Sequence, residues 1–293
     1  MKILIIADQE GCFNITCKQS NAERNQLMQS QVAKVLHSID PDWAVTILDC
    51  HDNGLNLFPL RASFPKINII SQLWNFNINE GYDCAIFIGF HVASGEDSIF
   101  AHTFRTEIEN TLLNNMSVGE VSLIALWLQS YNIPVLWVNG EDNLKAETER
   151  IGLNFISNKE LFENNFYFTI TSQKHYDDTF PVKIKLVNDK LLDAFPSAIF
   201  NIRDNHVIFK NIEEYLMHLS EISIFLNAAR NYYIMYLKKL VNRIKWNYTQ
   251  TEIELINDKR LVDLIFNTSL YSLRNDDLSY IETFINQQME TKQ

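Results

Sequence analysis

The chain has 293 residues, of which 46% are hydrophobic and 21% are charged, and its formal net charge is −11. This composition is ordinary for a globular protein, and the length suits one large domain or a medium domain with a smaller companion. The acidic balance excludes a general electrostatic attraction to nucleic acid or to anionic membranes.

Cysteine usage and hydropathy indicate a soluble, cytoplasmic protein. The four cysteines form no C-x-x-C pair, so the sequence has no zinc-finger or thioredoxin signature and no disulfide scaffold. No stretch approaches the roughly 18 consecutive apolar residues of a membrane-spanning helix. The first apolar run is too short for a signal-peptide core, because Asp8 and Glu10 end it. We therefore expect no membrane partner and no nucleic-acid partner.

The first half of the chain alternates between strand-like and helix-like segments. Continuous apolar runs of strand length are typical of strands buried on both faces, and apolar residues on one helical stripe indicate an amphipathic helix. These patterns predict strands at 2–7, 43–50, 83–90 and 133–140, and helices at 23–39, 117–132 and 141–152. The alternation predicts an α/β fold, with a mostly parallel sheet flanked by helices.

The second half has a different pattern, and a domain boundary is expected near residue 155. Strand-like segments lie at 166–171, 181–187 and 205–210, and a long helical segment rich in aromatic residues follows at 211–246. We expect an α/β catalytic domain at 1–155, a smaller α+β domain at 156–240 and a helical C-terminal extension at 241–293. The aromatic stripe at 231–241 fits either the core or an oligomer interface, and aromatic stripes mostly pack inside.

Polar side chains that can bind a metal ion follow three of the predicted strands. Asp8 and Glu10 come after the first strand, His51 after the second and His91 after the third. In parallel sheets, sites lie just beyond the carboxyl ends of the strands. Residues i and i+2 of an extended segment point to the same side, so both carboxylates can face one cation, and Gly11 permits a sharp turn beside them.

Each of these patterns also fits a structural role when it is taken alone. The carboxylates fit a polar turn, and a single histidine at a strand end is more often a hydrogen-bonded structural residue. Two such histidines in one sheet favour a metal site, and a mixed shell of imidazole and carboxylate suits Zn²⁺ or Mn²⁺ better than Mg²⁺. His102 is either a core histidine or a catalytic base or nucleophile. Glu120 completes the capping-box pattern S-x-x-E with Ser117, and spacing alone favours that capping role.

Several blocks in order resemble the DppA-type D-aminopeptidases, a bacterial family of dinuclear zinc metallopeptidases. They are "ADQEG", "LDCHDNGLN", "FIGFH", "AHT", "NNMSVGEVSLIA" and "IPVLWVNGED", all within residues 1–145. The resemblance implies two Zn²⁺ ions per chain with five ligands, Asp8, Glu10, His51, His91 and Glu120, of which Asp8 bridges the ions. It implies that His102 is the catalytic nucleophile or base. It also implies a homo-oligomer, a ring-shaped decamer, that acts on short peptides with an N-terminal D-amino acid.

Two regions depart from the family pattern, and they leave three hypotheses for the function. The segment between Gly152 and Pro181 is unlike the family, and residues from about 240 onward have no counterpart in it. The first hypothesis is a dinuclear zinc-dependent aminopeptidase for small D-residue peptides. The second, motivated by the altered segment, is a dizinc amidase or acyl-transferring enzyme of a specialised biosynthetic pathway. The third is a non-catalytic binding protein, which the intact set of six site residues argues against.

Overall fold

The computed structural model describes residues 1–170, 175–187, 191–192 and 195–228. The chain divides into two compact units, one of Met1–Ile184 and Ile208–Leu219, and the other of Lys185–Val207 and Ser220–Gln293. Every residue with a predicted role in the site belongs to the first unit. The predicted domain boundary near residue 155 stays a prediction, and the predicted extension at 241–293 lies outside the described residues.

A six-stranded sheet in the order β3-β2-β1-β4-β7-β8 forms the centre of the first unit. Its strands are β1 (Lys2–Ala7), β2 (Ala44–Asp49), β3 (Asn68–Ser71), β4 (Cys84–Phe90), β7 (Val135–Gly140) and β8 (Phe155–Ser157). All neighbouring pairs run parallel. The chain builds the sheet outward from β1 in one direction and then in the other. In such a doubly wound sheet, ligands bind in the crevice beyond the carboxyl ends of the strands where the direction reverses, here β1 and β4.

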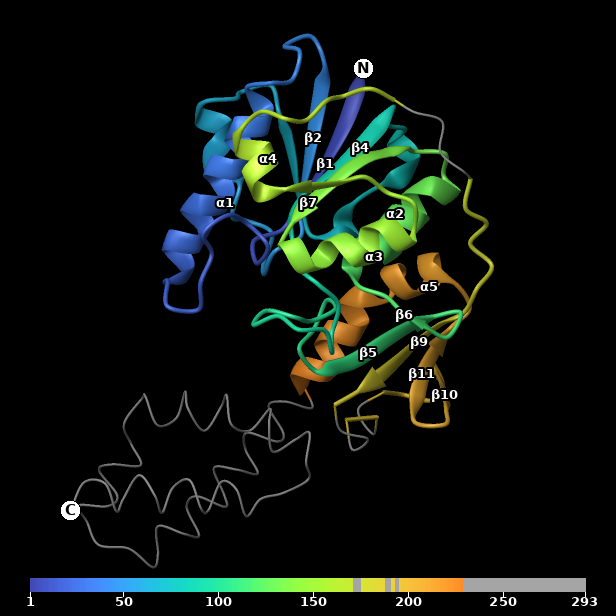
Figure 1. Ribbon diagram of the computed structural model, residues 1–293. Coiled ribbons are helices and arrows are strands. Elements are labelled where there is room, and N and C mark those ends of the chain that lie inside the picture. Colours follow the sequence, from blue (N-terminus) through green and yellow to red (C-terminus); the bar gives the residue numbers. More distant parts are fainter. Residues whose placement is uncertain (171–174, 188–190, 193–194, 229–293) are drawn as a thin grey trace, which may run out of the picture. The chain divides into compact units, whose positions relative to one another are not determined.

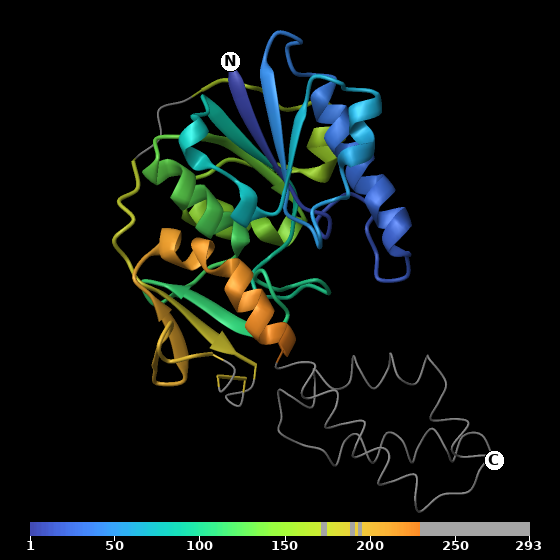
Figure 2. The same cartoon turned by 180° about the vertical axis from the view of Figure 1, so that it is seen from behind.

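Helices cover both faces of this sheet (Figure 1 and Figure 2). The helices α1 (Asn21–Leu36) and α4 (Asn158–Phe162) lie on one face, and α2 (Glu120–Ser130) and α3 (Lys145–Arg150) lie on the other. A capping box starts α1, because the Ser20 hydroxyl accepts the Glu23 N–H and the Glu23 carboxylate accepts the Ser20 N–H. The α/β fold class and the four strands predicted in the first half are confirmed. The short strands β3 and β8 were not predicted.

The core on the α1 face shows why β1 has a continuous apolar sequence. Ile3 and Ile5 of β1 pack there with Met28 and Val32 of α1. Leu4, which points to the opposite face of the sheet, is equally buried. Each such side chain contributes about 1.5–3 kcal/mol relative to an exposed one. Strand β1 is therefore buried on both sides, and its carboxyl end is held rigidly in the middle of the sheet.

A second sheet has five strands in the order β10-β11-β9-β5-β6. They are β5 (Ile108–Leu113), β6 (Met116–Ser117), β9 (Val182–Leu186), β10 (Asn201–Arg203) and β11 (His206–Phe209). β9 and β11 confirm the strands predicted at 181–187 and 205–210. β5, β6 and β10 were not predicted from the sequence.

The strand predicted at 166–171 is wrong for its described residues, because 166–170 have no regular secondary structure. The rings of Phe166 and Phe168 pack against Trp137 of β7. The Trp137 indole Nε1–H donates a hydrogen bond to the Tyr167 carbonyl at 2.9 Å. Alternating aromatic residues, which imitate a strand pattern, serve here to cover the core.

The long helix predicted at 211–246 is seen only in its first part. It begins as α5 (Ile212–Met217), and residues 219–228 are also helical. The aromatic stripe at 231–241 lies outside the described residues. In the part of the chain that the structure describes, no helix is both long enough and apolar enough to cross a membrane.

Candidate metal centre

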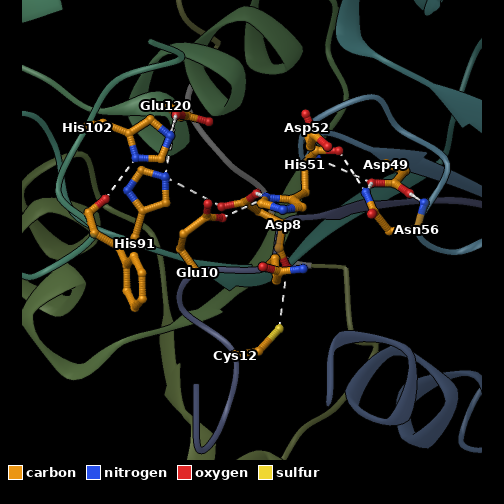
Figure 3. Close-up of polar contacts among 12 residues, drawn as sticks. Asp8, Glu10, Cys12, Asp49, His51, Asp52, Asn56, His91, His102 and Glu120 are labelled. Atoms are coloured by element: carbon orange, nitrogen blue, oxygen red, sulfur yellow. Dashed lines mark hydrogen bonds and ion pairs between the residues drawn. The ribbon is translucent and has the colours of Figure 1, made fainter. Parts of the chain in front are cut away.

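The six side chains predicted to form a site lie close together beyond the carboxyl ends of the central strands (Figure 3). Three elements of the parallel sheet bring them there. The six side chains are those of Asp8 and Glu10 after β1, His51 after β2, His91 after β4, His102 in the loop between β4 and β5, and Glu120 at the start of α2. Residues separated by up to 112 positions in the sequence are thus gathered at the point where the sheet reverses direction.

Two carboxylates surround His51 in one half of the site. His51 Nδ1 lies 2.9 Å from Glu10 Oε2 and 3.6 Å from Asp8 Oδ1. Burial alone would lower the pKa of His51, but the hydrogen bonds to Asp8 and Glu10 outweigh it and raise that pKa to about 10. Burial likewise opposes ionisation of Glu10, yet the hydrogen bond from His51 gives Glu10 a net lowered pKa. The two carboxylates in this half of the site therefore stabilise a positive charge placed beside them.

The other half of the site contains two histidines and Glu120. His91 Nε2 lies 3.5 Å from Asp8 Oδ2 and 3.5 Å from Glu120 Oε1, and His102 Nε2 lies 3.8 Å from Glu120 Oε1. The two imidazole rings stack, with centroids 4.1 Å apart and planes 12° apart. Asp8, Glu10 and His91 form one group whose candidate ligand atoms all lie within 4.8 Å of one another, and His91, His102 and Glu120 form a second.

Asp8 faces both halves with different oxygens, and its environment fits a bound cation. Asp8 Oδ2 and His91 Nε2 are buried and have no hydrogen-bond partner among the described residues. An unsatisfied buried polar group costs about 1–3 kcal/mol, so two of them facing each other need a further partner. Burial and the nearby Glu10 raise the pKa of Asp8 to about 7. A divalent cation would relieve both penalties, and carboxylate with imidazole is a donor set that Zn²⁺ accepts.

Backbone carbonyls orient the two stacked histidines. His91 Nδ1 lies 2.8 Å from the Val92 carbonyl, and His102 Nδ1 lies 2.8 Å from the Phe100 carbonyl. A carbonyl oxygen only accepts, so each Nδ1 carries a proton and each Nε2 is the ring atom that faces the carboxylates. Histidines that bind metals usually donate the other ring N–H in this way. Burial and the adjacent His91 lower the pKa of His102, which favours its neutral form.

Glu120 does not form the capping box that its spacing with Ser117 predicts, so that prediction is wrong. The N-cap of α2 is Gly119, which makes Glu120 the first helical residue instead of the third. The Ser117 hydroxyl donates to Asn110 Oδ1 at 2.9 Å. Glu120 Oε1 instead accepts the Phe104 N–H at 2.7 Å. The carboxylate is thereby turned away from the helix end and toward the histidines.

Three further carboxylates, which were not predicted from the sequence, hold the segments that carry these side chains. Asp49, the last residue of β2, accepts the backbone N–H groups that follow His51 in the loop. Glu141, after β7, accepts the Val92 N–H at 2.7 Å. Glu147 of α3 accepts the Gly119 N–H at 2.8 Å. Only Asp49 could have been found from the sequence, because it is a charged residue near the end of a mostly apolar predicted strand.

Two glycines let the loop after β1 pack directly on the end of β4. A Cβ atom on Gly11 would lie 1.7 Å from the Phe90 carbonyl oxygen, and one on Gly89 would lie 2.4 Å from the Asp8 carbonyl oxygen. Gly89 also has a φ of +76°, a left-handed conformation that suits glycine. The Gly11 N–H donates to the Gly89 carbonyl at 2.9 Å. The position of Asp8 and Glu10 is therefore tied to the backbone of β4.

Comparisons with known proteins agree on one family. The D-aminopeptidase family model matches residues 1–164. The D-aminopeptidase of Bacillus subtilis (strain 168) is 23% identical over 164 residues, which are 52% of this chain and 60% of that protein. The chain thus matches less than two thirds of the length of this curated relative.

A solved structure shows the same fold. It is that of the "Zn-dependent D-aminopeptidase DppA from Bacillus subtilis, a self-compartmentalizing protease", with a TM-score of 0.62 and 17% identity. The match covers 77% of this chain and 98% of that one. The family model itself covers more than half of this chain, and the matched residues include the whole six-stranded sheet and all six side chains of the site. The chain belongs to the D-aminopeptidase family.

Proposed function

We propose that this protein is a dinuclear zinc-dependent aminopeptidase that releases N-terminal D-amino acids from short peptides. The observation that carries the proposal is the position of Asp8, whose two carboxylate oxygens face opposite halves of the site. Oδ1 faces His51, which contacts Glu10, and Oδ2 faces His91, which contacts Glu120. One zinc ion would be held by Asp8, Glu10 and His51 and the other by Asp8, His91 and Glu120, so that Asp8 would be a ligand of both ions.

The charges of the site support two divalent cations. Asp8, Glu10 and Glu120 bring three negative charges into a buried space, and two Zn²⁺ ions bring four positive charges. The cations offset the repulsion between the carboxylates, and the remaining positive charge attracts an electron-rich group such as a peptide carbonyl. Bound zinc supplies Lewis-acid chemistry, because it lowers the pKa of water toward neutrality and polarises a carbonyl.

His102 is the residue that we assign to proton transfer. Its Nδ1–H is engaged by the Phe100 carbonyl, so Nε2 is the atom that accepts or returns a proton. The lowered pKa of His102, caused by burial and by His91, keeps this nitrogen unprotonated near neutral pH. Nε2 lies at the edge of the site, 3.8 Å from Glu120 Oε1. From there it can take a proton from the attacking water and return it to the leaving amine.

The substrate class and the assembly are inferred from the relatives. The neighbouring solved structure is described as a self-compartmentalizing D-aminopeptidase. We propose that this chain also forms a homo-oligomer, a decamer by family resemblance, and that it takes short peptides. The free α-amino group of a peptide can bind a metal ion or a carboxylate of the site, which would restrict cleavage to the N-terminal bond. Light scattering on the purified full chain measures the number of subunits.

The decisive experiment combines metal analysis with a substrate panel. We expect about two zinc ions per chain after zinc loading and desalting, and release of D-alanine from D-alanyl dipeptides but not of L-alanine from the matched L-alanyl dipeptides. A folded protein that takes up no zinc would refute the proposal. Cleavage of L-alanyl and D-alanyl peptides at equal rates would refute the stereochemical part alone.

A dizinc amidase or acyl-transferring enzyme is the second candidate. One observation favours it: the family match ends at residue 164, so the chain beyond that point, which includes most of the altered 152–181 segment, is not covered by the family model. The six side chains of the site would serve the same amide chemistry on a different molecule. Zinc-loaded protein that leaves every dipeptide intact but cleaves other amides would support this candidate over the aminopeptidase.

A further inference from the structure

Two buried carboxylates, Asp49 and Glu147, lie behind opposite halves of the metal centre. Asp49 is completely buried and Glu147 is 7% exposed. Neither forms an ion pair with any residue that the structure describes. A buried carboxylate without a cation is costly unless several N–H or O–H groups donate to it. The groups that donate to these two residues identify what each one holds in place.

Asp49 organises the loop that carries His51 (Figure 3). Its Oδ2 accepts the backbone N–H of Asn56 at 2.7 Å and of Leu57 at 3.0 Å. Its Oδ1 accepts the Asn56 side-chain amide at 3.1 Å and the His51 N–H at 3.3 Å. The same Asn56 amide nitrogen donates to the His51 carbonyl at 2.7 Å. Asp49 and Asn56 thus hold the His51 backbone on both its N–H and its carbonyl side.

Glu147 holds the first turn of α2, which carries Glu120. Its Oε1 accepts both the Gly119 N–H and the Ser122 hydroxyl. The contact is close, because a Cβ atom on Gly119 would lie 2.9 Å from Glu147 Oε2. Gly119 and Ser122 flank Glu120 in the chain, so a bond to each of them sets the direction of the Glu120 side chain.

We propose that Asp49 and Glu147 are positioning residues, each responsible for metal affinity in one half of the centre. Asp49 acts through His51, and Glu147 acts through Glu120. The proposal rests on the two-zinc site of the proposed function and adds a division of that site into two independently supported halves. Outer-shell partners of metal ligands typically change metal affinity about 10- to 100-fold when they are removed.

The hydrogen bonds predict that neutral substitutions act differently at the two positions. Both oxygens of Asp49 accept N–H groups, so the amide nitrogen of an Asp49→Asn variant must face a donor in either orientation. Only Oε1 of Glu147 accepts these bonds, so Glu147→Gln can keep both of them with its amide oxygen. We therefore expect Asp49→Asn to weaken zinc binding, Glu147→Ala to weaken it, and Glu147→Gln to preserve it. If these residues acted only through their charge, the Asn and Gln variants would behave alike.

The test measures zinc per chain after treatment with a chelating resin, for the full chain and its variants. The wild type should keep two ions, Asp49→Asn and Glu147→Ala one each, and Glu147→Gln two. To locate the loss, Asp49→Asn is combined with Glu10→Gln or with Glu120→Gln. The first pair should still hold one ion, because both changes affect the same half, and the second pair should hold none.

Two outcomes would overturn the inference. One is an Asp49→Asn variant that keeps two ions at wild-type affinity, and the other is an Asp49→Asn change that removes the last ion from the Glu10→Gln protein. Circular dichroism confirms that each variant is folded, and Asn56→Ala replaces Asp49→Asn if the latter does not fold. A wild type that never holds two ions would instead count against the proposed function, so the two failures are distinguishable.

Discussion

Gly11→Ala tests whether the metal centre depends on the close approach between the loop after β1 and the end of β4. The new Cβ atom would lie 1.7 Å from the Phe90 carbonyl oxygen, where real contacts are 3.0 Å or longer. The loop must therefore move by about 1.3 Å or more, and Asp8 and Glu10 move with it. Metal ligands tolerate displacements of only about 0.2 Å, and a misplacement of about 1 Å can cost 100-fold in rate.

We expect this variant to lose at least one zinc ion per chain and at least about 100-fold in kcat/KM. Overpacking of this kind also lowers the free energy of unfolding by about 1–3 kcal/mol, so stability needs its own control. Gly152→Ala provides it. Gly152 has a φ of +77° and no atom within 4 Å of the added Cβ, so it should lose about 1–2 kcal/mol through backbone strain alone.

The assays are zinc content by mass spectrometry, thermal unfolding, and hydrolysis of a D-alanyl dipeptide, on both variants in parallel. Gly152→Ala should keep its zinc and its kcat/KM despite its lower stability. If Gly11→Ala also keeps two zinc ions and a kcat/KM within threefold of the wild type, the claim that β4 positions the carboxylates is wrong.

Four further outcomes are expected. His102→Ala should retain two zinc ions but lose most of kcat, and a loss of zinc would instead make His102 a ligand. Glu120→Ala should lose mainly one zinc ion, and the zinc-free variant should unfold at nearly the temperature of the zinc-free wild type, because Glu147 accepts the Gly119 N–H at the start of α2; destabilisation of the zinc-free variant without zinc loss would instead give Glu120 a structural role. Gln31→Ala should lower the free energy of unfolding by about 1–3 kcal/mol with zinc unchanged, because the buried Gln31 amide donates to Asn139 Oδ1 at 2.6 Å. Removal of zinc by a chelator should lower the unfolding temperature by about 5–10 °C, since a ligand at 100 times its Kd raises the free energy of unfolding by about 2.7 kcal/mol. An unchanged unfolding temperature would show that zinc does not stabilise the folded protein.

The part of the site that lies at strand ends could be predicted from the sequence. A buried parallel strand has a continuous apolar sequence, so the first polar residue after it marks the carboxyl edge of the sheet. Asp8 and His91 each follow such a run directly, and His51 follows Asp49 at the end of β2; the structure brings the three together. The residue types then limit the chemistry, because carboxylates and imidazoles in one place indicate a metal.

The orientation of Glu120 could not be predicted from its local spacing. The start of α2 depends on Glu147, which is 28 residues away in the chain, so the local S-x-x-E pattern gave the wrong role. The short strand β8 has only three residues, too few to show a periodicity. The aromatic residues at 166–168 resembled a strand because packing against Trp137 demands the same residue types as a sheet does. In each case a distant contact overrides the local pattern.

The carbonyls of Val92 and Phe100, which orient His91 and His102, have a consequence for the exchange of metal ions. In each case the histidine and its carbonyl partner belong to the same loop and are only one or two residues apart in the chain. The imidazoles therefore acquire their direction when the chain folds, and not when an ion arrives. One ion could therefore replace another without reorienting these two histidines, so we expect the metal that occupies the site to depend on which divalent ions are available after folding.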